Sequence, residues 1–130
     1  MPETIVLTIG AEVASGPTLK ESRTLALDAY DKISVTVPDG TTNMEVQLGP
    51  GGAAGSTRLL IVKSSQYGDA LKYTVNSGTT DHVLDQPHVL IGAGAVGLFG
   101  SEPAKFVFDN ALGAGKDAQI QILIGRDATP

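Results

Sequence analysis

The chain has 130 residues, of which 42% are apolar and 18% charged, a composition typical of a folded domain rather than of a disordered segment. Its formal net charge is −5 and no cluster of lysine and arginine stands out, which argues against binding to the phosphate backbone of nucleic acids. It contains no cysteine, so disulfide scaffolds, thiolate metal sites and cysteine nucleophiles are excluded. The length predicts a single domain spanning residues 1–130.

The N-terminal segment has neither the basic region nor the long apolar region of a secretory signal, and no apolar run is long enough to cross a bilayer. We therefore expect a protein that folds in a cytoplasm and has no membrane partner. Pro2–Ile9 is short and apolar on one face. It fits two alternatives equally: a strand of the domain's own sheet, or an extended N-terminal strand or arm within residues 1–10 that pairs with a partner. In the second case Ile5, Leu7 and Ile9 are the partner-binding candidates.

Apolar and polar residues alternate along much of the chain, which is the pattern of strands with one buried face. Arg58–Val62 is apolar on both faces, so it is predicted to be a central strand, or its outer face meets a partner. A weak helical signal lies within Ser64–Ala70. The predicted strands are Thr4–Ile9, Arg23–Asp28, Lys32–Val37, Asn43–Leu48, Thr57–Ser64, Leu71–Asn76, His88–Ile91, Ala95–Phe99, Lys105–Asn110 and Ile120–Ile124.

Glycine and proline separate these strands. The 16 glycines and seven prolines leave little room for long helices, and several of them form turn sequences such as Val37–Gly40 and Gly113–Asp117. Short strands joined by such turns predict an all-β fold with little helix. We expect an antiparallel β-sandwich, jelly-roll-like in its connections, or a small barrel.

The segment Gly92–Gly97 follows an apolar strand and matches the G-x-G-x-x-G dinucleotide fingerprint. That chemistry needs a helix beginning in the loop, so that its amide groups face the pyrophosphate. Gly100 and Pro103 would end such a helix after about one turn, and Asp117 lies in a glycine-rich turn rather than after a second parallel strand. We therefore interpret the segment as a bend between strands and predict no bound cofactor.

Other sequences that could carry chemistry are weak. Gly49–Thr57 looks superficially like a phosphate-binding loop, but it lacks the lysine that reaches the terminal phosphates, and a long hairpin loop is the better interpretation. His82 and His88 lie near Asp81 and Asp85, but no spacing matches a metal site, and such groups beside a turn more often cap the surface. No Gly-x-Ser-x-Gly elbow is present. The sequence predicts no catalytic residue and no metal ligand.

Aromatic side chains are few, and tryptophan is absent. Phe106 and Phe108 alternate with Lys105, Val107 and Asp109 and are predicted to lie in the core. Tyr30 and Tyr67 fall in turn-like segments, where an exposed ring could bind a sugar or a protein. We add Tyr67 to the candidate partner-binding residues.

Two stretches of the C-terminal two-thirds, Arg58–Tyr73 and Phe106–Asn110 with Gln119–Asp127, resemble small virion proteins of tailed bacteriophages, most closely the capsid decoration (cement) proteins. The resemblance implies a non-enzymatic protein that binds the outer surface of the major capsid protein shell and stabilises it. It also implies a homo-oligomer, a trimer rather than a dimer, on the virion surface after assembly in the host cytoplasm. No catalytic residues come with this family. The alternative is a receptor- or glycan-binding β-sandwich module of a phage tail or head fibre.

Overall fold

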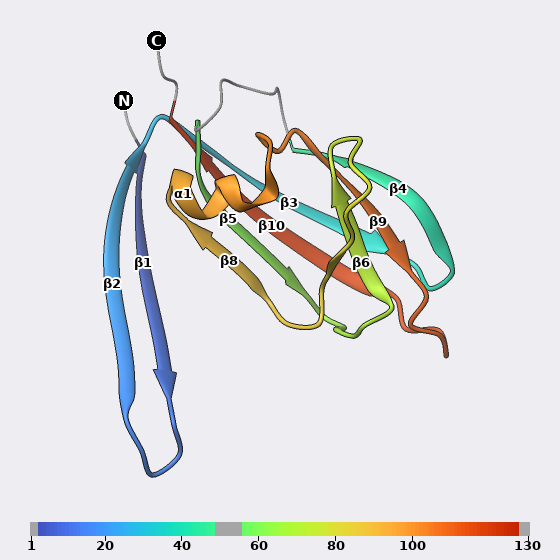
Figure 1. Cartoon of the computed structure of the whole chain (residues 1–130), viewed down its shortest axis with the longest axis horizontal. Helices are drawn as coiled ribbons and strands as arrows, with labels where there is room; N and C mark the ends of the chain where they lie inside the picture. The colour runs from blue at the N-terminus through green and yellow to red at the C-terminus, as the bar shows by residue number, and fades with distance from the viewer. Residues whose placement is uncertain (1–2, 49–55, 128–130) are drawn as a thin grey trace.

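The computed structural model describes residues 3–48 and 56–127, and within them it shows ten strands and one short α-helix (Figure 1). Strands account for 59% of the chain, and all of the paired strands are antiparallel. The predicted all-β class is therefore confirmed. Two four-stranded sheets pack face to face as a sandwich and neither closes into a barrel, so the barrel alternative is wrong.

Eight strands build the body of the sandwich. They are β3 (Ala29–Val37), β4 (Thr41–Gln47), β5 (Thr57–Ser64), β6 (Leu71–Val75), β7 (His82–Val83), β8 (His88–Ile91), β9 (Lys105–Asn110) and β10 (Ala118–Arg126). One sheet has the order β3-β10-β5-β8 and the other the order β4-β9-β6-β7.

The pairing of these strands is nested. β3 pairs with β10, β4 with β9, β5 with β8 and β6 with β7, so the chain folds like one long hairpin that is rolled into two sheets. This arrangement of eight strands in two sheets is that of a jelly roll. The pattern of the sequence thus predicted the architecture as well as the class.

The core lies between the two sheets, where the alternation places the apolar side chains. β10 contributes three fully buried isoleucines, and β9 contributes Phe106 and Phe108, which are 0% exposed. Tyr73 of β6 packs against both phenylalanines, with ring centroids 4.5 and 5.4 Å away. The predicted core position of the two phenylalanines is confirmed.

Two local predictions are wrong. Ala95–Phe99 is not a strand: Gly92 has a φ of 93°, and the chain then turns into α1 (Ala93–Val96) and a 3₁₀ turn, η1 (Gly97–Phe99). Ser64–Ala70 is not helical, because its amide groups bond elsewhere. The amide N–H of Ser64 donates to the Tyr67 hydroxyl at 3.0 Å, and that of Ser65 donates to the carbonyl of Gln119 at 3.0 Å.

The first two strands form a separate two-stranded sheet, here called the arm (Glu3–Leu27). β1 (Glu3–Glu12) and β2 (Thr18–Leu27) pair without a register shift along their whole length. The turn between them closes with a 2.7 Å bond from the Gly16 N–H to the Val13 carbonyl. Both strands exceed the predicted Thr4–Ile9 and Arg23–Asp28. Figure 1 shows the arm leaving the body near the start of β3, with its turn well away from both sheets.

Candidate functional site

The two faces of the arm differ in polarity. In an antiparallel pair, residues directly opposite each other share a face. Ile5 lies opposite Leu25, Leu7 opposite Arg23 and Ile9 opposite Glu21. With Ala11 and Leu19 near the turn, these residues form a largely apolar face, here called the apolar arm face. The other face alternates mainly threonine, serine and lysine, with Val6 as an exposed exception.

Most of the apolar arm face lies in water. Ile9 is 38% exposed and Leu19 is 73% exposed, whereas the isoleucines on the inner face of β10 in the body are fully buried. Glu21 and Arg23 lie on the same face, with their charged groups 3.8 Å apart and both side chains exposed. An exposed apolar stripe with a polar rim is the usual mark of a protein contact surface.

The base of the arm is anchored to the body at Gly125. A Cβ atom added to this glycine would collide with Cδ1 of Leu27, and it would lie 3.4 Å from Leu59 and 3.6 Å from Cδ1 of Ile5. Leu59 is 0% exposed although it is outside the main core cluster, and Leu27 is buried. The amide of Asp28 also donates to the carbonyl of Arg126 at 3.0 Å. The missing side chain at Gly125 therefore leaves room for the arm to rest on the sheet.

The predicted partner-binding residues lie in three places: at the anchor, on the exposed part of the arm, and in the β5–β6 connection. Ile5, Leu7 and Ile9 share the apolar arm face, but Ile5 contributes to the anchor at the base and Ile9 is exposed nearer the turn. The segment was expected either to join the sheet of the domain or to pair with a partner. It does neither in this structure, because β1 pairs with β2 of the same chain in a separate two-stranded sheet. Tyr67 is not on the arm. It is half-buried against the core in the β5–β6 connection.

A second apolar surface lies on the outer face of the sheet β3-β10-β5-β8. The register aligns Leu123 of β10 with Ile61 of β5, and Ile61 with Val89 of β8, which is 45% exposed. Tyr30, 51% exposed, lies opposite Gly125 on the same face. We call Ile61, Leu123 and Val89 the sheet strip. β5 is central, as predicted, and its outer face also meets another segment, which is the arm.

The sequence missed part of both surfaces. Leu19 was not recognised because Glu21 and Arg23 interrupt the alternation of β2. Leu123 and Val89 were placed in strands, but nothing local says which strands become neighbours. The available signal for Leu19 was that it shares its face with Leu25 and Leu27, whereas no signal in the sequence joins β5, β8 and β10.

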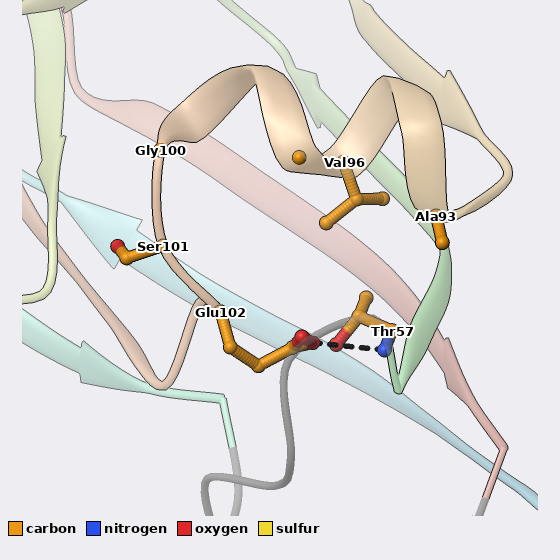
Figure 2. A pocket seen from close by; sticks show the side chains of 7 residues that line it. Thr57, Ala93, Val96, Gly100, Ser101 and Glu102 are labelled. Carbon is orange, nitrogen blue, oxygen red and sulfur yellow. Dashed lines mark hydrogen bonds between the residues drawn. The ribbon is translucent and has the colours of Figure 1, made fainter.

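The glycine segment forms a small pocket of about 160 Å³ beside α1 (Figure 2). Its lining residues are Thr57, Ala93, Val96, Gly97, Gly100, Ser101 and Glu102. The Glu102 carboxylate accepts a 2.8 Å hydrogen bond from the Thr57 amide. Since α1 has four residues and Gly100 closes η1 with a φ of 84°, the predicted early end of the helix is confirmed. A carboxylate at the pocket also disfavours a pyrophosphate group.

The remaining described residues of the phosphate-loop-like segment and of the dinucleotide fingerprint do not line this pocket. Gly49–Gly55 of the loop-like segment lie outside the described residues. Asp117 accepts a 3.0 Å hydrogen bond from the amide of Asp39 at the turn before β10. This carboxylate thus holds two turns together instead of facing the glycine segment.

The two histidines lie beside Tyr73. The His88 Nε2–H donates to the carbonyl of Val83 at 3.0 Å, so Nδ1 is the acceptor of the 2.6 Å bond from the Tyr73 hydroxyl. His82 meets Phe99 edge to face, with ring centroids 5.0 Å apart. Burial lowers the pKa of His82, the charge of His88 lowers it further, and Asp81 opposes both. Burial raises the pKa of Tyr73. The arrangement ties β6, β7 and β8 together.

Among residues 3–48 and 56–127, no three histidine, aspartate or glutamate side chains gather as metal ligands would. In the same part of the chain, no helix has the length and hydropathy to cross a membrane. Comparisons with protein-family models, with curated proteins and with solved structures found no match.

Proposed function

We propose that this chain is a non-enzymatic structural protein of a tailed-phage virion, a capsid decoration (cement) protein that binds the outer surface of the shell made by the major capsid protein. The observation that carries the proposal is the arm. It projects from a stiff body and carries exposed apolar side chains out to its turn, where Val13 is 59% exposed. Such a surface suits adhesion to another protein.

The body supplies what an adhesive arm needs. A sandwich of two packed sheets is rigid, so the arm starts from a fixed point at Gly125. Jelly rolls recur in viral capsid and lectin domains, although one fold serves many functions, so the fold supports the proposal only by analogy.

Charge and repetition favour a position on the outside of a shell. A net charge of −5 disfavours contact with packaged DNA. A shell presents many equivalent sites, and several weak contacts made by one oligomer add through effective concentration. No single contact of the arm then has to be tight.

The test mixes the full chain with expanded shells that lack it, taken from the tailed phage whose genome encodes it. Saturable cosedimentation and a higher melting temperature of the shell are expected. Val13→Asp at the turn of the arm, where Val13 is 59% exposed, should weaken binding at least about tenfold, because it puts a charge in an apolar contact. Ser22→Asp on the polar face of β2 is the matched control and should bind normally.

Failure to bind the shells under these conditions would contradict the proposal. Retention of a sugar on a glycan array, together with indifference to shells, would instead favour the glycan-binding module. In that case the exposed ring of Tyr30 is the expected contact, and Tyr30→Ala should abolish retention.

A further inference from the structure

Two apolar surfaces of the chain do not meet each other within one copy. Figure 1 shows the arm and β10 close together at the base of the arm and diverging along their length, so the turn of the arm ends far from the sheet. The anchor at Gly125 holds Ile5 and Leu27, whereas Ile9 and Leu19 lie beyond it. A two-stranded ribbon has no second layer of its own, so the part of its apolar face beyond the anchor is uncovered within one copy.

The outer face of the body has a hollow lined by apolar side chains, two lysines and a glutamine. It has a volume of about 260 Å³ and is lined by Lys32, Ile61, Lys63, Gln121, Ile122 and Leu123. Ile61 and Leu123 belong to the sheet strip, and two lysines flank them. A branched apolar side chain that enters the hollow would cover the strip and leave the lysines at the rim.

Charge complementarity identifies a second copy of this chain as the occupant. On the apolar arm face, Glu21 lies directly opposite Ile9. Arg23, whose charged group is 3.8 Å from that of Glu21, lies opposite Leu7 two residues nearer the base. Lys32 and Lys63 stand on the same outer face as Ile61 and Leu123. With Ile9 over the strip, Glu21 comes to the lysine rim, and a buried apolar centre with a charged rim is the anatomy of a protein interface.

The contact between the arm and the sheet at Gly125 also supports a second copy as the occupant. The arm already packs on this sheet at its base, where Ile5 and Leu27 meet Gly125 and Leu59. The sheet strip begins two residues further along β5 and β10, at Ile61 and Leu123. A second arm on the strip would extend the same apolar layer across the sheet.

We propose that the arm of one copy docks its apolar face on the sheet strip of a second copy, with Ile9 in the hollow and Glu21 against Lys32 and Lys63. The contact joins two different surfaces, so its repetition gives a closed ring when the rotation between copies closes and a filament when it does not. It uses no capsid component and therefore does not rest on the proposed function.

Engineered cysteines test the contact directly, because the chain has none of its own. A tagged Ile9→Cys variant is mixed with an untagged Leu123→Cys variant and oxidised under mild conditions. A disulfide between the two unlike chains is expected in high yield. The matched control replaces Ile9→Cys by Thr8→Cys, which lies on the opposite face of the arm and should give at least about tenfold less product. Equal yields from the two mixtures would overturn the proposal.

Light scattering after size exclusion gives the second readout. The full chain is expected to be an oligomer whose apparent dissociation constant rises at least about tenfold in Glu21→Lys, and Lys63→Glu in the same chain should restore it. A monomer at all concentrations overturns the inference, as does an oligomer that ignores Glu21→Lys and Ile9→Asp. Circular dichroism confirms that each variant folds. Shell binding by a monomer would leave the proposed function standing and remove only this contact.

Discussion

The arm and the body of this molecule are built from the same alternation of apolar and polar residues, but they place their apolar side chains in opposite environments. In β10, Ile120, Ile122 and Ile124 are at most 1% exposed, because a second sheet covers them. In the arm, Ile9 follows the same alternation in β1 and is 38% exposed, and Leu19, opposite Ala11 on the same face, is 73% exposed. An alternating pattern therefore identifies a strand, but a second layer decides whether its apolar face is buried.

The body supplies most of the stability of the chain, whereas the arm supplies much of its exposed apolar surface. Burial of apolar surface is the main favourable term in folding, so the body holds most of the folding free energy. The arm depends on its cross-strand pairs and on its anchor at Gly125. Substitutions in the two regions should differ in size accordingly.

The largest effect is expected in the centre of the body. Phe108→Ala should lower the free energy of unfolding by about 3–5 kcal/mol, because it empties a fully buried position beside Phe106 and Tyr73. Urea titration followed by circular dichroism measures the change. A loss below about 1 kcal/mol would contradict a core centred on these rings.

The anchor should respond less strongly. Gly125→Val places a side chain where Leu27 lies and is expected to cost about 1–3 kcal/mol. Hydrogen exchange should show faster exchange of the arm amides, with the body little changed. Gly94→Ala is the matched control, because nothing lies within 4 Å of a Cβ there. Unchanged exchange in the arm would mean that its base is not held at this glycine.

A fall in pH should lower the free energy of unfolding of the body by less than Gly125→Val does. The folded state lowers the pKa of His82 from its ordinary value of 6.5, mainly by burial, so the unfolded chain binds this proton first. Stability from this group is complete above pH 6.5 and falls as the pH drops below that value. Urea titrations from about pH 5 to 8 measure the slope. His82→Gln should flatten it, and an equal slope in that variant would assign the effect to other groups.

The smallest effect is expected near the turn of the arm. Leu19→Thr should change the free energy of unfolding by less than about 0.5 kcal/mol in dilute protein, since the side chain is 73% exposed and threonine suits a strand. The same urea titration measures it. A larger loss in a monomer would show that the arm folds back on its own body.

Much of the fold was predictable because one face of most strands is buried. Thr57–Ser64 and Lys105–Asn110 were found at their observed bounds, and the predicted Lys32–Val37 begins three residues after the start of β3. Lys32–Val37 alternates regularly, whereas Thr57–Ser64 was marked by its continuous apolar run. Ala95–Phe99 failed because alanine and glycine carry no alternation, and Gly92 and Gly100 set a helical turn there through positive φ.

The surfaces were less predictable than the strands. Ile5, Leu7 and Ile9 were found because they alternate in one short segment, whereas the sheet strip joins residues from three strands that are distant in sequence. Gly125 reads as an ordinary glycine, and its part in seating the arm follows only from Leu27 being packed over it. Local patterns show which residues share a strand, while long-range pairing decides which strands share a surface.

The nested strand pairing sets an order in time as well as in space. The outermost pair, β3 with β10, joins the most distant parts of the body and carries the greatest loop-closure cost, so it is expected to form late. During synthesis the arm leaves the ribosome long before Gly125, the residue on which it rests. Ribosome-bound nascent chains that end before β10 would then present an unseated arm, and its apolar side chains would be open to chaperones until the last strand closes the roll.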